Sequence, residues 1–290
     1  MPAMTIQNTL PTFRTVALLR DTIRAWQGQG LRVALIPTMG ALHAGHMALV
    51  TRALQVADRA VASVFVNPTQ FGPKEDFASY PRRESEDAML LMKNGGHGLY
   101  APTVDEMYPE GFVTSITVGG PSAGLCGDFR PGHFSGVATV VTKLLLQSGA
   151  DVALFGEKDY QQLQVIRRLV RDLNIPTVIE GVPTVRESDG LAMSSRNAYL
   201  SVEERAIAPI LHQTLMAMAS RVAERAPIAE QEAWGRKQLL TAGFRAVDYL
   251  SVRDAESLTP LDTLTGAARI LAAAHLGKTR LIDNVGVRPA

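Results

Sequence analysis

Two histidines stand three residues apart at the exit of an apolar run, in the segment IPTMGALHAGHMALV (36–50). Gly40 and Gly45 permit a ligand to approach the backbone closely. A helix beginning near His46 would point unpaired N–H groups and the positive end of its dipole at that ligand, and the rings of His43 and His46 could aim at the same place. A phosphate chain suits all three features. A turn without a ligand and a metal site are the alternatives, although two histidines are too few ligands for zinc.

A second charged turn precedes a helical pattern in the segment LFGEKDYQQLQVIRRLV (154–170). An apolar, strand-like run ends in Gly156, and Glu157, Lys158 and Asp159 follow it. Lys158 would reach phosphate oxygens as a point charge. The alternative is a solvated helix cap formed by Asp159.

Hydroxyl and guanidinium groups gather in the loop SDGLAMSSRNAYLS (188–201). Ser194, Ser195 and Arg196 follow one another shortly before a predicted helix. Such groups can bind a triphosphate as charge develops on it. A loop that only leads into the helix is the alternative.

Two amide side chains follow a predicted strand in the segment VFVNPTQFGPKEDFASYPR (64–82). Asn67 and Gln70 carry both donors and acceptors, which suit an uncharged polar substrate. The alternative is an ordinary Asn-Pro turn.

Short apolar runs alternate with helical patterns through the first part of the chain. This alternation predicts parallel strands joined by right-handed crossovers, and so an α/β fold with a doubly wound, Rossmann-like sheet. Ligands of such sheets lie beyond the carboxyl ends of the strands. The predicted strands are 31–36, 61–66, 98–101, 152–155 and 177–183, and the predicted helices are 45–58, 83–94, 135–148 and 159–173.

The sequence pattern changes after about residue 184. We expect a nucleotide-binding catalytic domain over 1–184 and a smaller α+β domain over 185–290 that covers the active site. Ser201 and Glu204 form a capping-box pattern at the start of a long helix. The elements predicted in this second part are that helix over 201–226, a helix over 228–242, a strand over 246–255 and a β-hairpin over 268–287.

Length, charge and composition exclude several classes of protein. The 290 residues are 46% hydrophobic, and a net charge of +1 gives no basic surface of the kind that binds nucleic acid. A single cysteine allows no internal disulfide, which fits a reducing compartment. No apolar run reaches the ~18 residues of a membrane span, and residues 1–21 lack the pattern of a signal peptide. We therefore expect a cytoplasmic protein without nucleic-acid or membrane partners.

The four segments together resemble a known family. His-x-Gly-His after the first strand of an α/β sheet resembles the His-Ile-Gly-His signature of the nucleotidyltransferase superfamily, and MSSRN resembles a reduced form of its Lys-Met-Ser-Lys-Ser loop. Taken with CGDFRPGHFSGVATVVTKLL and GVPTVRESDGLAMSSRN, they look like the segments of the pantoate–β-alanine ligase (pantothenate synthetase) family. The resemblance covers essentially the whole chain and is strongest from 36 to 200.

The resemblance implies an AMP-forming acid–amino-acid ligase of pantothenate and coenzyme A biosynthesis. Such an enzyme joins (R)-pantoate to β-alanine with ATP through a pantoyl adenylate, and it releases pyrophosphate and AMP. The first step needs no serine or cysteine nucleophile, because the pantoate carboxylate is already ionised. It needs in-line positioning and positive charge around the reacting phosphate. Magnesium on the ATP phosphates and a homodimer are also implied.

The resemblance also assigns roles to residues. His46 takes the main catalytic role, as a proton donor or as a neutral donor of one hydrogen bond. Gln70 and Gln162 hold pantoate, with Gln70 also near β-alanine, and Asn67 and Arg130 are weaker candidates near substrate or phosphate. The implied catalytic residues are His43, His46, Lys158, Ser194, Ser195 and Arg196. The implied ATP site comprises Met39, Gly40, Ala41, Leu42, His43, Ala44, Gly45, His46, Gly156, Glu157, Lys158, Asp159, Val185, Met193, Ser194, Ser195 and Arg196.

Asp87, in RRESEDAML, is the candidate carboxylate for magnesium, against the alternative of a solvated helix face. LGKT (276–279) is not a Walker loop, because Ala272 stands five positions before Gly277, and we expect a hairpin tip there. We expect the isolated histidines to be structural and Cys126 to have no partner that would mark it as a nucleophile. These histidines are His97, His212 and His275.

Three other functions are alternatives to the ligase. The main rival is a transferase that places AMP or CMP on another phosphate-bearing substrate. An aminoacyl-tRNA synthetase would need a basic anticodon-binding region, which this chain does not have. A nucleotide-binding sensor without chemistry would not need both histidines, Lys158 and the Ser-Ser-Arg loop.

Overall fold

The computed structural model describes residues 9–73 and 75–289, and its first part is built on a six-stranded parallel sheet. All pairings between neighbouring strands of this sheet are parallel. The predicted α/β class with a doubly wound, Rossmann-like sheet is therefore confirmed. The strands are β1 (Thr12–Phe13), β2 (Val33–Thr38), β3 (Arg59–Val64), β4 (Gly98–Tyr100), β5 (Val152–Gly156) and β6 (Val178–Val182), in the spatial order β1-β4-β3-β2-β5-β6.

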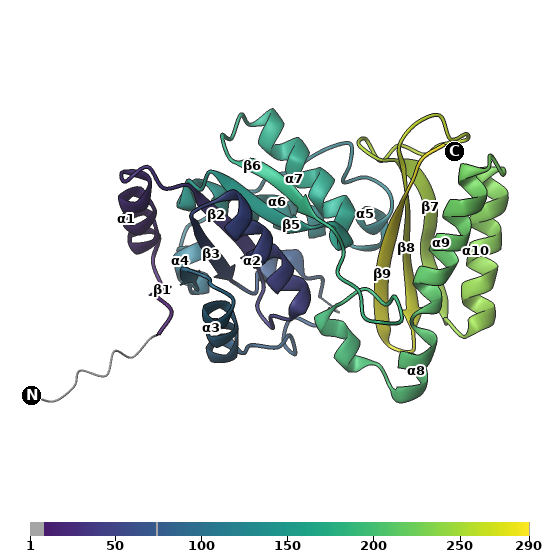
Figure 1. Ribbon diagram of the computed structural model, residues 1–290, viewed down its shortest axis with the longest axis horizontal. Coiled ribbons are helices and arrows are strands. Elements are labelled where there is room, and N and C mark those ends of the chain that lie inside the picture. The colour runs from purple at the N-terminus through teal and green to yellow at the C-terminus, as the bar shows by residue number, and fades with distance from the viewer. Residues whose placement is uncertain (1–8, 74, 290) are drawn as a thin grey trace, which may run out of the picture.

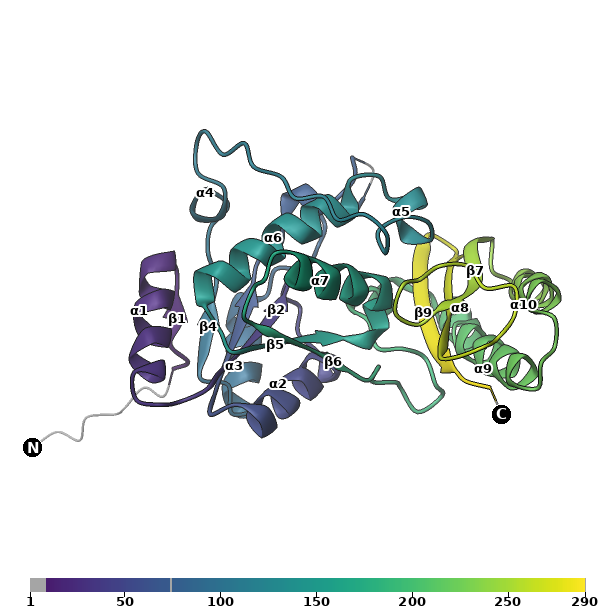
Figure 2. The ribbon, with the colours of Figure 1, turned by 90° about the horizontal axis from the view of Figure 1, so that it is seen from above.

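Both faces of this sheet are covered by helices, α6 and α7 on one face and α2 and α3 on the other (Figure 2). Successive strand residues point to opposite faces: Val33 and Leu35 pack with the core under α1, α6 and α7, whereas Ala34 and Ile36 pack with the core under α2 and α3. Burial on both faces is why the strands are apolar throughout. The helices are α1 (Val16–Gln27), α2 (Ala44–Val56), α3 (Glu84–Lys93), α4 (Val104–Met107), α5 (Cys126–Phe129), α6 (His133–Ser148) and α7 (Tyr160–Asp172).

The strand order reverses between β2 and β5, which lie side by side in the interior of the sheet. From β2 the chain winds outward through β3 and β4, and it then returns to β5 and continues to β6 on the other side. The crevice beyond the carboxyl ends of strands at such a reversal is where open α/β sheets bind ligands. The histidine turn follows β2 and the Lys158 turn follows β5, so both flank this crevice.

The second part of the chain forms a smaller α+β unit around a three-stranded antiparallel sheet (Figure 1). Helices α9 and α10 pack on this sheet and share a separate hydrophobic core with it. The predicted hairpin is present, with Gly277 in its turn at φ +54°. The elements are α8 (Val202–Ile207), α9 (Ile210–Ala223), α10 (Ile228–Ala242), β7 (Ala246–Asp254), β8 (Ala268–Leu276) and β9 (Thr279–Val287).

Two details differ from the sequence-based expectations. The helix predicted over 201–226 is two helices, because Pro209 has no N–H for a helical hydrogen bond and α9 begins directly after it. The capping box of Ser201 and Glu204 is present at the start of α8. Strand β1 and helices α1, α4 and α5 were not predicted. The division at 184 and 185 stays a prediction, and residues 1–8 of the predicted first domain lie outside the described residues.

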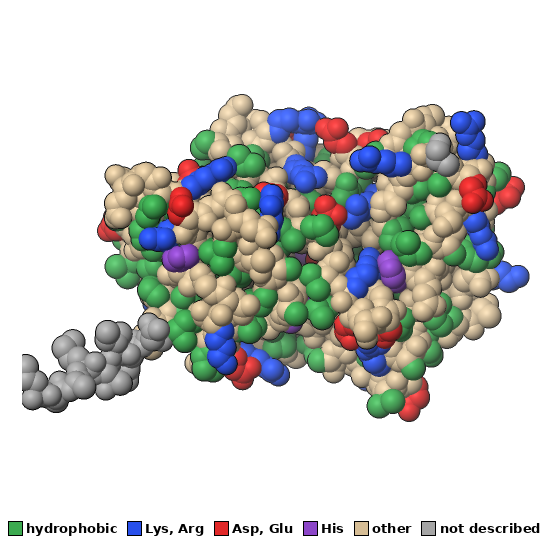
Figure 3. Space-filling view, in the orientation of Figure 1, with side chains coloured by type: hydrophobic (Ala, Val, Ile, Leu, Met, Phe, Trp, Pro, Cys, Tyr) green, Lys and Arg blue, Asp and Glu red, His purple; other side chains and the backbone are tan. Residues whose placement is uncertain are grey.

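Basic and acidic side chains are interspersed over the face shown in Figure 3, in keeping with the net charge of +1. Across the described part of the chain, no helix combines the length and apolar character that crossing a membrane requires.

Candidate active site

His43 and His46 together form a capping box at the N-terminus of α2. His43 is the N-cap, and its Nδ1 accepts a hydrogen bond from the Gly45 N–H at 3.1 Å. In return, His46 Nδ1 accepts from the His43 N–H at 3.2 Å. The ring centroids lie 4.2 Å apart. Gly45 leaves room for this ring, because a Cβ at this position would lie 2.8 Å from His43 Cε1.

This capping arrangement determines which ring nitrogen carries the proton. An Nδ1 that accepts an N–H is unprotonated, so each neutral imidazole carries its proton on Nε2. Burial, followed by the charge of His43, lowers the pKa of His46 to about 3. Burial and the neighbouring Lys158 also lower the pKa of His43. Both rings are therefore neutral at pH 7, and each offers one Nε2–H donor.

Asp87 holds the histidine turn in place from α3. Its two carboxylate oxygens accept hydrogen bonds from the backbone N–H groups of Ala41 (3.0 Å) and Leu42 (2.7 Å), and the residue is only 2% exposed. Burial raises the pKa of this carboxyl group, and the two N–H groups oppose that rise. The alternative of a solvated helix face is wrong, because Asp87 is buried. Its carboxylate serves the histidine turn, and its role as a magnesium ligand stays a prediction.

The loop that contains the two serines lies directly against the histidine turn. Ser195 Oγ donates to the Ala41 carbonyl at 3.3 Å, and Ser194 Oγ accepts from the Arg196 N–H to cap a short 3₁₀ helix, η3 (Ser195–Tyr199). The Arg196 guanidinium pairs with Asp76 through two contacts, 3.1 and 2.9 Å long. The site thus joins segments that are more than 100 residues apart in sequence.

Lys158 lies on the turn after β5, within a 3₁₀ helix, η2 (Glu157–Asp159). Its side chain is 20% exposed, and its Nζ lies 3.8 Å from Asp159 Oδ2. Asp159 stands at the N-cap position of α7, but its side chain makes no capping hydrogen bond. The cap alternative for Asp159 is therefore correct in position, but its carboxylate makes no capping bond and lies near the Lys158 ammonium group.

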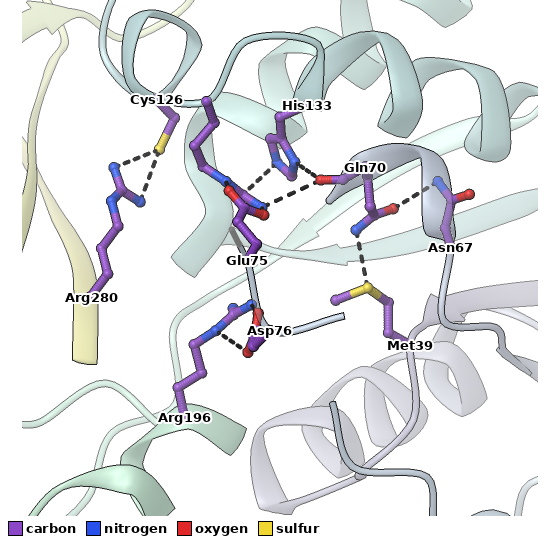
Figure 4. A network of polar contacts seen from close by, with 10 residues as sticks. Met39, Asn67, Gln70, Glu75, Asp76, Cys126, His133, Arg196 and Arg280 are labelled. Atoms are coloured by element: carbon purple, nitrogen blue, oxygen red, sulfur yellow. Dashed lines mark hydrogen bonds and ion pairs between the residues drawn. The ribbon is translucent and has the colours of Figure 1, made fainter. Parts of the chain in front are cut away.

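Gln70 is held by a chain of buried contacts (Figure 4). Its Nε2 donates to Met39 Sδ at 3.0 Å, and its Oε1 accepts from Asn67 Nδ2 at 3.1 Å. Asn67 is 1% exposed; its Nδ2 also donates to the Gly136 carbonyl, and its Oδ1 accepts from the Tyr108 hydroxyl. Because these partners are all within the protein, Asn67 holds the Gln70 side chain in place. A Cβ at Gly136 would lie 2.3 Å from the Thr69 carbonyl oxygen, so α6 can approach this turn only at a glycine.

Arg130 is engaged in an ion pair and does not present a free guanidinium. Its Nε and Nη2 bind Glu75 at 2.7 and 2.6 Å, and Nη1 lies 3.0 Å from His133 Nε2. His133 Nδ1 donates to the Gln70 carbonyl at 2.9 Å. Burial and the Arg130 charge lower the pKa of His133 to about 4, so this ring is neutral and its Nε2 accepts. These contacts appear around Gln70 in Figure 4.

Two adjoining cavities contain most of the predicted site residues. One, of about 230 Å³, lies at the carboxyl ends of β2 and β5; the other, of about 720 Å³, extends toward the C-terminal sheet. The smaller cavity is lined by these predicted residues: Met39, His43, Gly45, His46, Asn67, Gln70, Gly156, Lys158, Asp159, Gln162, Val185, Met193, Ser194, Ser195 and Arg196. Residues that line both are Lys158, Asp159, Gln162, Ser194 and Arg196, and Arg130 lines only the larger.

Some predicted ATP-site residues lie behind the cavity walls. Gly40 has φ +89°, and a Cβ there would meet Val64 and Asp87, so it shapes the turn. Glu157 turns away to pair with Arg269 at 3.0 Å. The predicted residues that line neither cavity are Gly40, Ala41, Leu42, Ala44, Glu157 and Asp87.

Sequence reasoning missed part of the smaller cavity. Its apolar wall includes Phe65, directly after β3, and four residues of α6, Val137, Val140, Val141 and Leu144. The helix over 135–148 was predicted, but the sequence could not show that part of it faces a cavity. Thr184 was also missed; its Oγ1 is buried without a hydrogen-bond partner among the residues that the structure describes, and its position next to Val185 was the available signal.

Cys126 has partners that the sequence did not indicate. Its Sγ lies 3.0 Å from the Tyr249 hydroxyl and 3.5 Å from Arg280 Nη2, both on the C-terminal sheet. The expectation that no partner marks Cys126 as a nucleophile stays a prediction, although the thiol does have polar partners. His97 accepts the Ala60 N–H, and His275 bonds Asp248, so both have structural partners.

Comparison with known proteins assigns the family. The family model described as pantoate-beta-alanine ligase matches residues 11–286. The chain belongs to the pantoate–β-alanine ligase family. Pantothenate synthetase of Paramagnetospirillum magneticum is 64% identical over 276 residues, which cover 95% of this chain and 97% of that protein.

Solved structures agree with this membership. The crystal structure of pantothenate synthetase from Thermus thermophilus superposes with a TM-score of 0.91 at 49% identity, covering 97% of this chain and all of that one. Pantoate-beta-alanine ligase from Francisella tularensis, complexed with beta-gamma ATP and beta-alanine, superposes with a TM-score of 0.80 at 31% identity. The match covers 95% of this chain and 97% of that one. The resemblance inferred from the sequence is confirmed, as is the expectation that the chain is an enzyme of this family.

Proposed function

We propose that this protein ligates (R)-pantoate to β-alanine with ATP, through a pantoyl adenylate, and releases pyrophosphate and AMP. The observation that carries the proposal is convergence: the histidine turn, Lys158 and the serine–arginine loop meet on one cavity that Gln70 and Gln162 also line. The beta-gamma ATP and beta-alanine complexed with the Francisella relative support this choice of substrates.

In the first step, a pantoate carboxylate oxygen bonds to the α-phosphorus of ATP and the bond to pyrophosphate breaks. The Nε2–H groups of His43 and His46 would donate to phosphate oxygens, and Lys158 and Arg196 would balance the developing charge. A His46 that is already neutral at pH 7 serves as a hydrogen-bond donor, because it holds no extra proton to give. Of the two roles considered for His46, we therefore propose the second.

Pantoate would be held by its hydroxyls and its methyl groups. Gln70 and Gln162 offer donors and acceptors to the two hydroxyls, so an analogue without a hydroxyl would leave a polar group unpaired. The apolar wall of Phe65, Val140 and Leu144 suits the dimethyl-substituted carbon. This division leaves the carboxylate free to react.

In the second step, the neutral amine of β-alanine attacks the acyl carbon of the adenylate. The carbon–oxygen bond to AMP breaks, the amide forms, and the amine gives up a proton to solvent water. The larger cavity adjoins the smaller one at Lys158 and Gln162, which gives a second substrate room to approach.

We also propose magnesium on the ATP phosphates. Within residues 9–73 and 75–289 no group of three His, Cys, Asp or Glu side chains is placed to hold a metal ion. This fits magnesium, which commonly binds through substrate phosphates, water and one or two carboxylates, and Asp159 at the cavity would be such a carboxylate. Bound there, the ion would neutralise phosphate charge. The homodimer and the cytoplasmic location stay predictions.

The test is a product assay. The protein is incubated with ATP, magnesium and pantoate, with and without β-alanine, and the products are identified by mass spectrometry. We expect AMP and pantothenate only when both acids are present. Intact ATP in the complete mixture would overturn the ligase, and a transferase with another acceptor would become the better proposal.

A further inference from the structure

Two consecutive residues of β9 hold the two segments that carry the proposed phosphate-binding groups. Asn284 Nδ2 donates to the carbonyl oxygens of both Glu157 and Lys158, each at 2.9 Å. Asp283 binds Arg186, next to Val185 at the start of the other segment, through two contacts of 2.7 and 2.9 Å. The C-terminal sheet therefore contacts both walls of the site from one point.

The orientation of the Asn284 amide follows from its partners. The two carbonyl oxygens can only accept, so they face the NH₂ group, and the Arg269 guanidinium can only donate, so it faces Oδ1. Arg269 also pairs with Glu157 and stacks 4.1 Å from the Tyr160 ring. With Asn284 only 3% exposed, water does not compete for these contacts.

We propose that Asn284 is a positioning residue for Lys158. Its amide fixes the carbonyl groups of two successive residues in the turn, and so fixes where the Lys158 side chain starts. Lys158 makes one long ionic contact of its own, 3.8 Å to Asp159, which leaves its placement to the backbone. The proposal rests on the proposed function, in which Lys158 meets the phosphates of ATP.

The first test compares three variants on neighbouring positions. Asn284→Ala removes the amide, and Asn284→Asp keeps its size but replaces both donors with oxygen. Val285→Ala is the control, because Val285 packs in the C-terminal core and is about as buried. A displacement of about 1 Å at a reacting group can lower a rate about 100-fold, and we expect both Asn284 variants to lower kcat at least about tenfold.

The kinetic pattern separates positioning from general destabilisation. The Asn284 variants should lower kcat/KM for ATP while KM for β-alanine changes less than about twofold. Val285→Ala should lower the Tm as much as Asn284→Ala but keep kcat within about twofold of the parent. Equal kcat losses in Asn284→Ala and Val285→Ala at matched Tm loss would overturn the proposal.

A double-mutant cycle tests the connection to Lys158 itself. If Asn284 acts through Lys158, adding Asn284→Ala to Lys158→Ala lowers kcat by less than about twofold further. Additive losses would show that Asn284 acts elsewhere. Failure of the proposed function looks different, because the parent protein would then form no pantothenate. In that case calorimetry would still compare ATP binding by the parent with ATP binding by the Asn284 variants. Weaker binding by the variants would support the positioning role, and equal binding would overturn it.

Discussion

Arg196 and Asp76 form a two-point ion pair at the larger cavity, although they are 120 residues apart in sequence. The guanidinium also lies 6.0 Å from the Tyr80 ring centroid. The carboxylate of Asp76 thus occupies two of the five N–H donors of this guanidinium. In the proposed complex, a phosphate group of ATP would compete with this internal anion for Arg196.

Asp76→Asn should therefore tighten ATP binding. Both side chains are partly exposed, and such ion pairs contribute roughly 0.2–1 kcal/mol, so we expect Kd for ATP to fall about two- to fivefold. Calorimetry at low and high salt would measure the change, which should shrink as salt rises. Glu75→Gln is the matched control, because it frees Arg130 and leaves the Arg196 pair in place. Weaker ATP binding by Asp76→Asn would show that Asp76 assists the bound state.

Two substitutions at His46 should separate catalysis from capping. His46→Asn keeps an acceptor for the His43 N–H but has no Nε2–H, whereas His46→Ala loses both. We expect kcat to fall about 10²–10³-fold in each variant, as when a donor to a developing anion is removed. Only His46→Ala should also lose about 1 kcal/mol of unfolding free energy, measured with urea. An unchanged kcat in either variant would remove His46 from the mechanism.

Gln70→Ala should raise KM for pantoate more than KM for ATP. The loss of a hydrogen bond to an uncharged hydroxyl costs about 0.5–1.5 kcal/mol, or up to about tenfold in KM. Asn67→Ala should act in the same direction, because Asn67 holds the Gln70 amide at 3.1 Å. Steady-state kinetics with each substrate varied in turn would measure this, and equal changes in both KM values would count against the assignment.

Asp87→Asn should weaken the histidine turn without changing the response to magnesium. An amide has one oxygen for the two N–H groups of Ala41 and Leu42, so we expect a lower kcat/KM for ATP and an unchanged magnesium concentration at half-maximal rate. Glu86→Gln, an exposed neighbour on α3, is the control and should change neither quantity. A rise of about tenfold in the magnesium requirement would instead support Asp87 as a metal ligand.

His133 should make the protein less stable as the pH falls from about 6.5 to 4. Its pKa is about 4 in the folded protein and about 6.5 in an unfolded chain, so over this range the unfolded state binds more protons and the unfolding free energy decreases. The contribution is fully present above pH 6.5. His133→Asn can still donate to the Gln70 carbonyl but does not titrate. Urea midpoints from pH 8 to pH 4 should therefore fall less in this variant, and an identical pH dependence would refute the assignment.

Much of the site could be predicted from short stretches of sequence. The histidine turn, the Lys158 turn and the serine–arginine loop are each one short, continuous stretch of sequence. The spacing of His43 and His46 after an apolar run could therefore be recognised without the fold. Strand and helix periodicities are local too, which is why the parallel sheet and the terminal hairpin were predicted. The helix over 201–226 failed on a local signal as well, since Pro209 was available to break it.

The sequence by itself determined which chemical groups are present and which turns carry them, because both depend on short stretches of chain. Only the tertiary structure decided which of these groups already have a hydrogen-bond or ion-pair partner within the protein. Asp76 reaches Arg196, and Asn284 reaches Lys158 from 126 residues away, while Asp87 binds the backbone of the histidine turn. The reason is physical: a polar group's role depends on the partners within about 3 Å of it, and only the folded chain brings distant residues to that distance.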